Sequence, residues 1–447
     1  MSGENPMSGD AMRFAPVFRG SRFAVLGLAR AGLPAAVALQ AMGAEVYAWD
    51  DSPAARAGGQ GLTLLPPSAI GKPLTGLVLS PGIPHGLPRP HPEAAWARAQ
   101  GVPILTDAEL LYRAVRGSAS AARFAGITGT NGKSTTTALL AHILTRAGIP
   151  NAAGGNLGTA ALGLPPLPDN GVYVLEMSSY MLERIATLRF DVAAMLNLSP
   201  DHLDRHGDMA AYAMAKRQIF ARQDTDCTAV IGIDDTDSRA MAAWRETMPG
   251  RVARVSGAAF CVAGGRALPG EHNAQNAFAA SEMARALGVT EEAIAEGIMS
   301  FPGLPHRQAE IAEIAGIRFI DDSKGTNADA TARAMACYER FIWIAGGIAK
   351  AGGIAPLAGF FPRVAKAFLI GQDAPALAAT LAGHGVAHEI SGTLAKAVPA
   401  AFAAARAEGA AVVLFSPACA SFDQFRSFEE RGEVFAECVG LLRRGNG

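Results

Sequence analysis

Several features that mark secreted, metal-clustered and membrane-spanning proteins are missing from this sequence. The five cysteines are scattered and odd in number, and no pair has metal-binding spacing, so a disulfide framework is not expected. Residues 1–20 have no apolar core of signal-peptide length, and no run approaches the roughly 18 apolar residues of a membrane span. We therefore expect a cytoplasmic protein without membrane association.

Charge is scarce as well. Only 18% of the residues are charged and the formal net charge is -1, which gives no bulk attraction for nucleic acid. Half of the residues are hydrophobic, which excludes a disordered chain. A length of 447 residues suggests two or three globular domains.

What the sequence does contain is three blocks in which short apolar runs alternate with Ala- and Leu-rich helical stretches. Such alternation is typical of α/β folds with parallel, doubly wound sheets. Ligands of these folds gather at the carboxyl ends of the strands. The expected strands lie within residues 23–39, 45–51 and 76–84, then near 124 and within 172–179 and 192–202, and finally within 341–347, 367–371 and 411–418.

The first block has an incomplete dinucleotide-binding turn. Gly27, Ala29 and Gly32 occupy the three positions of a G-x-G-x-x-G pattern. Glycines there let a diphosphate approach the backbone and the following helix N-terminus. Asp50 ends the next expected strand, where NAD-binding proteins carry an acid. These residues alone leave open a dehydrogenase, another nucleotide site and an empty Rossmann turn.

The second block opens with GITGTNGKST over residues 126–135. It ends like a phosphate-binding P-loop, but Ile127 stands where the general pattern has glycine. Gly129 and Gly132 free the backbone to turn its N–H groups toward phosphate oxygens. Lys133 would bring positive charge to the β- and γ-phosphates, and Ser134 could reach Mg²⁺. We therefore expect a nucleotide site.

Polar residues follow several later strands. Glu176 ends an apolar strand, and a carboxylate there suits Mg²⁺, which prefers oxygen ligands. Residues 200–207, PDHLDRHG, could form a metal or phosphate corner, whereas the helical Lys216 would ordinarily lie on a solvated face. The third block has polar loops at residues 321–327, 346–350 and 416–432, which could receive a substrate that bears carboxylates.

Taken together and in this order, these residues resemble the Mur ligases of peptidoglycan synthesis, over nearly the whole chain. The motifs that carry the resemblance are SPGIP (80–84), GTNGKST (129–135), ExSS (176–179), DHLDRHG (201–207), GEHNAQNA (270–277), HR (306–307), DDSKGTN (321–327) and SPACAS-x-D-x-F-x-x-F-x-x-RG (416–432). The resemblance implies three domains. They would be a Rossmann-like UDP-binding domain (1–118), a central P-loop ATPase-type domain (119–305) and a Rossmann-like C-terminal domain (306–447) that binds the amino acid.

The resemblance also implies the reaction. ATP would phosphorylate the carboxylate of UDP-N-acetylmuramoyl-L-alanine, and the amine of D-glutamate would attack the acyl phosphate. Two Mg²⁺ ions would assist. No nucleic-acid or membrane partner is implied, and we expect a monomer.

Carried over residue by residue, the resemblance assigns four groups of site residues. ATP would contact Gly129, Thr130, Asn131, Gly132, Lys133, Ser134, Thr135, Asn273, Asn276, Arg307 and Asp322. The acceptor would contact Gly27, Leu28, Ala29, Asp50, Ser80, Pro81, Gly82, Asn156 and Ser178. D-Glutamate would contact Lys324, Thr326, Lys350, Ser421, Phe422 and Phe428. The metal ligands would be Ser134, Glu176, His202 and a carbamylated Lys216, and the catalytic residues Lys133, His202 and Lys216.

The chain departs from the family pattern at three places. Tyr180 and Met181 follow the ExSS motif, where an aromatic residue and glutamine are usual. Residues 346–350, GGIAK, replace a more polar form, which weakens the assignment of Lys350, and Ala29 stands where glycine is common. None of these changes removes a group that the chemistry needs.

Other functions are less compatible with these motifs. A P-loop GTPase would need an NKxD-like motif, a dehydrogenase would leave the P-loop unexplained, and a non-catalytic UDP-sugar binder would not need Lys133, Glu176, His202 and Lys216. Among ATP-dependent amide ligases, a folylpolyglutamate synthase or another Mur ligase is the alternative, although no DNPR-like motif is present. L-Glutamate remains an alternative substrate.

Overall fold

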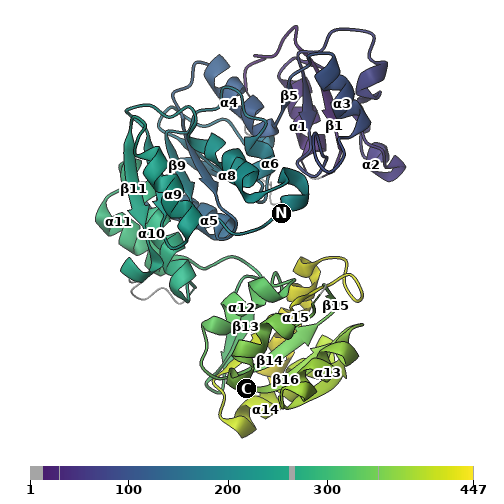
Figure 1. The fold of residues 1–447 in the computed structure, drawn as a ribbon, viewed down its shortest axis with the longest axis vertical. Helices are drawn as coiled ribbons and strands as arrows, with labels where there is room; N and C mark the ends of the chain where they lie inside the picture. Colours follow the sequence, from purple (N-terminus) through teal and green to yellow (C-terminus); the bar gives the residue numbers. More distant parts are fainter. Residues whose placement is uncertain (1–13, 30, 261–266, 351, 446–447) are drawn as a thin grey trace, which may run out of the picture. The chain divides into compact units, whose positions relative to one another are not determined.

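A computed structural model describes residues 14–29, 31–260, 267–350 and 352–445. The chain divides into two compact units. The N-terminal unit comprises Met1–Val262 and Asn273–Met299, and the C-terminal unit comprises Ala263–His272 and Ser300–Gly447. The N-terminal unit holds two sheets, and the C-terminal unit holds a third sheet with a short two-stranded ribbon (Figure 1).

The first sheet is parallel throughout, with the order β3-β2-β1-β4-β5. Its strands are β1 (Arg22–Leu26), β2 (Glu45–Trp49), β3 (Thr63–Leu64), β4 (Gly76–Leu79) and β5 (Ile104–Leu105). The accompanying helices are α1 (Gly32–Ala41), α2 (Pro53–Ala57), η1 (Pro67–Ala69), α3 (Pro92–Ala99) and α4 (Asp107–Gly117). The expected strands of the first block are confirmed, and the turn after β1 lies at the carboxyl edge.

The second sheet is also parallel throughout, with the order β11-β10-β9-β6-β8-β7. Its strands are β6 (Arg123–Thr128), β7 (Asn151–Gly155), β8 (Val172–Glu176), β9 (Val192–Met195), β10 (Thr228–Gly232) and β11 (Arg251–Val255). The helices of this part are α5 (Lys133–Arg146), η2 (Ala161–Gly163), α6 (Ser179–Leu182), α7 (Leu203–His206), α8 (Met209–Arg217), η3 (Gln218–Phe220), α9 (Thr236–Arg245), η4 (Gly257–Ala259), α10 (Glu271–Ala286) and α11 (Glu291–Ser300).

One apolar core joins the two sheets of the N-terminal unit. The rings of Phe124 and Tyr173 stack with centroids 5.0 Å apart, and Tyr112 of α4 meets Phe124 edge-on at 5.2 Å. The buried Glu109 of α4 adds a polar connection, because its carboxylate accepts the N–H groups of residues 186–188 at 2.9–3.0 Å. Charge-assisted bonds of this kind are among the stronger hydrogen bonds in proteins, so α4, which follows β5 of the first sheet, is firmly attached to the segment before β9 of the second sheet.

The third sheet is mixed, with the order β12-β13-β18-β14-β16-β17, and β12 runs antiparallel to β13. Its strands are β12 (Ala309–Ile314), β13 (Ile317–Asp321), β14 (Phe341–Gly346), β16 (Val364–Ile370), β17 (His388–Gly392) and β18 (Val412–Phe415). The antiparallel ribbon consists of β15 (Ile348–Ala349) and β19 (Cys419–Ala420). The helices are α12 (Ala328–Ala336), η5 (Ala355–Arg363), α13 (Ala374–Gly383), α14 (Leu394–Glu408) and α15 (Phe428–Gly445).

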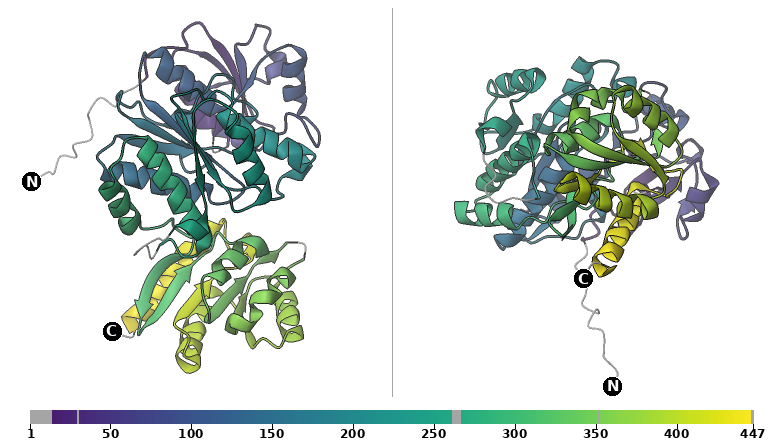
Figure 2. Two further views of the ribbon diagram at one scale, coloured as in Figure 1. Left: turned by 60° about the vertical axis from the view of Figure 1, so that its left-hand side comes forward. Right: turned by 90° about the horizontal axis from the view of Figure 1, so that it is seen from below.

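Helices lie on both faces of the third sheet (Figure 2). A separate apolar cluster lies on each face. Successive residues of β14 point to opposite faces, so Trp343 packs with α12, α13 and η5, whereas Ile342 and Ile344 pack with α14 and α15. The α/β class is therefore confirmed, although the antiparallel edge strand β12 was not foreseen. The boundaries 1–118, 119–305 and 306–447 remain a prediction; each contains one of the three main sheets.

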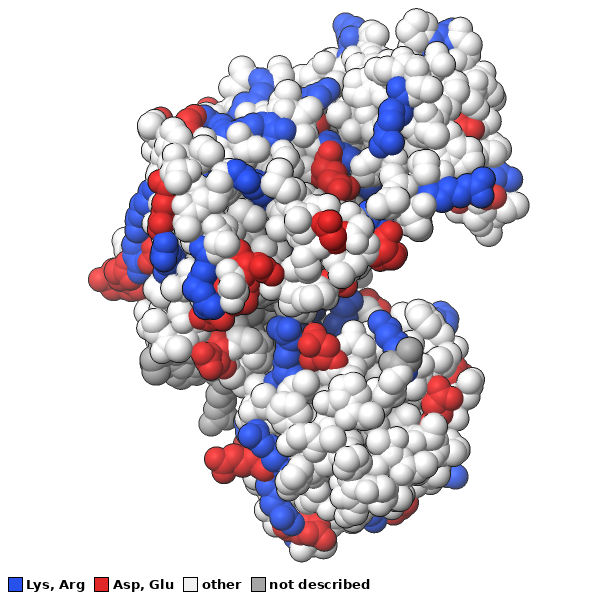
Figure 3. All heavy atoms as spheres, in the orientation of Figure 1, with Lys and Arg blue, Asp and Glu red and all other residues white. Residues whose placement is uncertain are grey.

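The mixed surface charge and the length and polarity of the helices agree with what the composition predicted. Lys and Arg side chains are interspersed with Asp and Glu on the face drawn in Figure 3. Within the described part of the chain, every helix is too short or too polar to cross a membrane.

Candidate functional site

The turn after β1 is held by glycine and by Asp50. A Cβ on Gly32 would lie 1.7 Å from the carbonyl oxygen of Gly27, so only glycine fits where α1 begins. The Asp50 carboxylate accepts the N–H of Leu28 at 2.7 Å through Oδ2 and that of Ser52 at 2.9 Å through Oδ1. Asp50 therefore fixes the turn as well as facing the hollow beside it.

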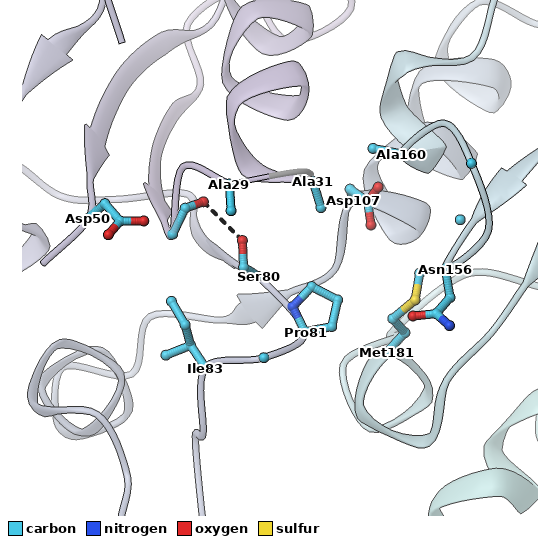
Figure 4. Close-up of a pocket in the computed structure, with 14 residues that line it drawn as sticks. Ala29, Ala31, Asp50, Ser80, Pro81, Ile83, Asp107, Asn156, Ala160 and Met181 are labelled. Carbon is cyan, nitrogen blue, oxygen red and sulfur yellow. Dashed lines mark hydrogen bonds between the residues drawn. The ribbon is translucent and has the colours of Figure 1, made fainter. Parts of the chain in front are cut away.

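This hollow, called here the first hollow, has a volume of about 310 Å³. Figure 4 shows Asp50, Ser80 and Asn156 around it, together with the hydrogen bond that Ser80 Oγ donates to Gly27 O at 2.9 Å. Seven of the nine residues assigned to the acceptor line it: Gly27, Ala29, Asp50, Ser80, Pro81, Gly82 and Asn156. The buried Asp107 also lines it, and burial raises the pKa of its carboxyl. No motif in the sequence pointed to Asp107.

The P-loop runs from β6 into α5, as expected. Gly132 adopts φ +84°, and a Cβ there would lie 2.2 Å from Asn276 Oδ1, so the loop and α10 approach closely. Asn276 in turn donates to Asn273 Oδ1 at 3.1 Å. The Lys133 ammonium folds over its own loop and donates to the carbonyls of Gly129 and Thr130 at 2.9 and 2.8 Å.

Asn197, which sequence reasoning missed, holds the tip of the P-loop. Its carbonyl accepts the Thr130 N–H at 2.9 Å, and its side chain exchanges hydrogen bonds with the Asn131 backbone at 2.8 and 3.1 Å. Those two loop N–H groups are therefore already used, and the N-terminus of α5 offers the remaining donors to a phosphate. The available signal was an asparagine just beyond β9, at the carboxyl edge of the sheet.

A second hollow of about 340 Å³ lies beside the P-loop, within the N-terminal unit. It brings together the three predicted catalytic residues, Lys133, His202 and Lys216. The other lining residues are Pro81, Gly82, Asn156, Ser178, Ser179, Tyr180, Asp201 and Tyr212. Pro81, Gly82 and Asn156 line both hollows, so the two hollows meet at these residues.

Lys216 is buried, with 2% of its surface exposed, which excludes the solvated face that its helix suggested. Its Nζ donates to Gly129 O at 2.8 Å and to Thr128 Oγ1 at 3.3 Å, and lies 4.7 Å from the centre of the Tyr212 ring. Burial, and then the nearby Lys133 ammonium, hold the pKa of Lys216 well below its ordinary value.

Glu176 and His202 are two of the predicted metal ligands. Glu176 Oε1 accepts from Asn156 Nδ2 at 2.7 Å, whereas the buried Oε2 has no hydrogen-bond partner among the described residues. A carboxylate oxygen in that state suits a hard cation. In the ranges that the structure describes, no three His, Cys, Asp or Glu side chains cluster as metal ligands. Any bound ion would therefore need further oxygen ligands, such as water.

Tyr180 and Met181 occupy the positions where the chain departs from the family motif. The Arg205 guanidinium lies 4.3 Å above the Tyr180 ring, and that ring stacks on His206 with centroids 5.5 Å apart. The Tyr180 ring also lies 5.0 Å from His202. Met181 lines the first hollow. The usual amide is thus replaced by a thioether at the wall of the first hollow, and Tyr180 supports the wall of the second hollow.

Arg431 organises the polar loops of the C-terminal unit. Its buried guanidinium donates to the backbone oxygen of Ser323 at 2.8 Å, to Ser323 Oγ at 3.0 Å and to Cys419 O at 3.0 Å. Lys324 lies 3.7 Å from the centre of the Phe428 ring, which brings two residues of the predicted glutamate group together. Ser421 is buried, whereas Lys350 and Phe422 are exposed.

The assigned ATP residues fall in both units. The P-loop, Asn273 and Asn276 belong to the N-terminal unit, and Arg307 and Asp322 to the C-terminal unit. Asp322 is buried and accepts a hydrogen bond from Ser416 Oγ at 2.6 Å. Burial raises the pKa of Asp322 from an ordinary 3.8 to about 7.

Asp322 should make the unliganded protein more stable in mild acid. Its pKa is higher in the folded chain, so the folded state holds more protons between pH 3.8 and about 7. The stabilisation is therefore complete below pH 3.8 and is lost as the pH rises toward 7. We expect Asp322→Asn to flatten the pH dependence of the free energy of unfolding in this window, measured with urea. Asp329→Asn, at an exposed acid of α12, should leave the wild-type slope unchanged, and an unchanged slope in Asp322→Asn would contradict the assignment.

The fold and this site define the class of the protein. A parallel sheet whose strand β6 leads through a glycine loop into α5, beside an acid that ends the neighbouring β8, is a P-loop nucleotide-binding architecture. The family described as the Mur ligase middle domain matches residues 127–263.

Relatives match the chain over almost its full length. The UDP-N-acetylmuramoylalanine--D-glutamate ligase of Paramagnetospirillum magneticum is 48% identical, over 96% of this chain and 98% of that protein. The protein of the same name from Caulobacter vibrioides is 45% identical, over 96% and 98%. The chain therefore belongs to the family of UDP-N-acetylmuramoylalanine--D-glutamate ligases, within the Mur ligases.

Solved structures agree with this fold. The UDP-N-acetylmuramate-alanine ligase MurC of Thermotoga maritima superposes with a TM-score of 0.57 at 18% identity, covering 94% of this chain and 99% of that chain. MurF of Acinetobacter baumannii gives a TM-score of 0.57 at 19% identity, covering 94% and 92%.

Proposed function

We propose that this chain is a cytoplasmic ATP-dependent ligase that adds D-glutamate to UDP-N-acetylmuramoyl-L-alanine during peptidoglycan precursor synthesis. The observation that carries this proposal within the structure is the meeting of the two hollows at Pro81, Gly82 and Asn156. A long acceptor can place its nucleotide in the first hollow and extend its carboxylate past these residues toward Lys133. The full-length similarity to ligases of that name supports the same substrates.

In the proposed reaction, a carboxylate oxygen of the acceptor attacks the γ-phosphorus of ATP while the bond to ADP breaks. The amine of D-glutamate then attacks the acyl carbon, phosphate leaves with the bonding electrons, and the nitrogen loses a proton. Two anions meet in the first step, so the main task of the site is to neutralise charge. Lys133 donates to two P-loop carbonyls and would serve the β- and γ-phosphates.

Bound Mg²⁺ would supply further positive charge at the transferred phosphoryl group. Ser134 and Glu176 would hold one ion, for which the unpartnered Oε2 of Glu176 is suited. His202 and Lys216 would hold the second. An ammonium cannot bind a cation, so Lys216 would act after its neutral amine adds to CO₂ and releases a proton, which gives a carbamate with two oxygens. Its burial at the wall of the second hollow supports that role.

The C-terminal unit would bind D-glutamate through Lys324, Thr326, Lys350, Ser421, Phe422 and Phe428. Each contact between an ammonium and a carboxylate of the substrate would contribute about 1.5–3 kcal/mol. Arg431 would keep the loops around Ser323 and Cys419 in place. We also propose that the enzyme works as a monomer.

Phosphate release from ATP tests the function. The purified chain should release phosphate with UDP-N-acetylmuramoyl-L-alanine and D-glutamate together, and mass spectrometry should find the joined product. Glycine, L-glutamate and meso-diaminopimelate provide the comparison. Equal turnover with D-glutamate and glycine, or no turnover with either, would contradict the proposal.

A further inference from the structure

The segment that separates the two hollows, residues 79–83, is called here the acceptor loop. Pro81 and Gly82 line both hollows, and Ser80 and Ile83 line the first. Only part of the loop is fixed by its own sheet, since the Ser80 N–H bonds to Leu26 O at 3.0 Å and Ser80 Oγ bonds to Gly27 O. The Ile83 N–H bonds to Ser80 O within the loop at 3.1 Å, and the loop carbonyls are held from the central part of the N-terminal unit.

Five consecutive carbonyls of the acceptor loop accept hydrogen bonds from two arginines. Arg184, which follows α6, donates to residues 79, 80 and 81 at 2.7, 3.4 and 3.3 Å. Arg205 of α7 donates to residues 82 and 83 at 3.2 and 3.5 Å. Every carbonyl of the loop is therefore directed toward a guanidinium.

Arg184 is an unusual residue to bury. It is 3% exposed, its hydrogen bonds in the described residues go to carbonyl oxygens, and its Nε has no partner there. Burial lowers the pKa of this guanidinium to about 10. A buried cation without a hydrogen-bonded carboxylate is costly to fold, and a well-packed apolar side chain would serve stability as well. The hydrogen bonds to the three loop carbonyls offset part of that cost.

The geometry of the peptide group shows how the hydrogen bonds from Arg184 orient the acceptor loop. In a trans peptide the C=O and the following N–H point in opposite directions. The Pro81 carbonyl faces Arg184, so the Gly82 N–H lies on the opposite side of the loop. No backbone or side-chain acceptor in the described residues bonds to that N–H. Holding the carbonyls therefore directs one free donor away from the protein interior, at the residue where the two hollows meet.

We propose that Arg184 and Arg205 are positioning residues that hold the acceptor loop so that Gly82 N–H meets the bound acceptor at the junction of the two hollows. The inference rests on the proposed function. Arg205 also packs on Tyr180, which contacts His202, so the loss of Arg205 would disturb the wall of the second hollow as well. Of these groups, Arg184 contacts only the acceptor loop, so its substitution gives the cleaner test.

The test compares three variants by steady-state kinetics and by calorimetric titration with UDP-N-acetylmuramoyl-L-alanine. Arg184→Met removes the donors, and Arg184→Lys keeps the charge with a single nitrogen. Arg222→Met is the matched control, because Arg222 donates to the carbonyls of Ile185 and Ala186 at 2.9 and 2.6 Å, next to Arg184, without reaching the loop.

We expect Arg184→Met to raise the KM and Kd of the acceptor at least about tenfold, with the KM of ATP and of D-glutamate within twofold of the wild type. Arg184→Lys should recover part of the affinity, and Arg222→Met should match the wild type. An acceptor KM within twofold in folded Arg184→Met, or an equal rise for all three substrates, would overturn the proposal. If Arg184→Met does not fold, the KM and Kd of Arg184→Lys relative to the wild type decide the proposal by the same criteria.

The binding data separate this inference from the function on which it rests. If the wild-type chain binds the acceptor but does not ligate D-glutamate, the proposed function fails and the Kd values still decide the role of Arg184. If the wild type does not bind the acceptor at all, both fail.

Discussion

Lys133→Ala is expected to lower the kcat for phosphate release by about 100- to 1000-fold, the usual effect of removing one preorganised group that stabilises transition-state charge. The reaction brings a carboxylate to a triphosphate, and Lys133 is the P-loop cation of the second hollow. Because its ammonium lies within 2.9 Å of the carbonyls of Gly129 and Thr130, it is already placed over the loop before any phosphate binds.

The measurement is steady-state phosphate release at saturating substrates, with thermal unfolding as the test of folding. Lys72→Ala is the control, because Lys72 is an exposed lysine of the same unit that pairs with Glu45 and lines neither hollow. It should keep wild-type turnover. A folded Lys133→Ala that retains turnover within threefold of the wild type would contradict the role of the P-loop.

Lys216→Ala should lose activity to a similar extent, about 100-fold or more. The expected carbamate would supply two oxygens to a metal ion, and alanine supplies none. The substitution also leaves a space at the wall of the second hollow, where the buried lysine stood. A short carboxylate such as acetate can enter that space and present the same two oxygens, so added acetate should restore part of the turnover.

Lys216→Met separates the chemistry from the packing. Methionine fills most of the volume of the lysine stem, so this variant should be as inactive as Lys216→Ala but should not respond to acetate. Wild-type protein prepared with ¹³C-bicarbonate should show a carbamate signal by NMR that both variants lack. Full activity in Lys216→Ala, or equal rescue of both variants, would refute the carbamate.

The structural elements that could be predicted best from the sequence are those specified by residues close together in the chain. The strand–loop–helix unit around residues 123–146 is confirmed because β6, the glycine loop and α5 are each specified locally by apolar pattern and glycine position. The edge strand β12 was missed, although it pairs with the adjacent β13 through the short turn at Ala315–Gly316, because its alternation of buried and exposed residues is weak.

Long-range contacts explain what could not be predicted from the residues themselves. Lys216 lies in a helix whose local pattern is compatible with a solvated face, and only the approach of α8 to the P-loop buries it. Asn197 and Arg184 act on loops 66 and more than 100 residues away in the chain, so no local pattern reveals them. Asp50 was correctly singled out as a strand-end acid, but its oxygens bind backbone N–H groups, one of Leu28 in the turn after β1 and one of Ser52 at the start of α2.

The most direct test of the account follows the oxygen that the proposed acyl phosphate transfers. UDP-N-acetylmuramoyl-L-alanine labelled with ¹⁸O in its carboxylate is incubated with ATP, Mg²⁺ and D-glutamate, and the released phosphate is analysed by mass spectrometry. We expect each phosphate to carry one ¹⁸O atom and its release to require D-glutamate. Unlabelled phosphate, or labelled phosphate at the same rate with glycine in place of D-glutamate, would contradict it.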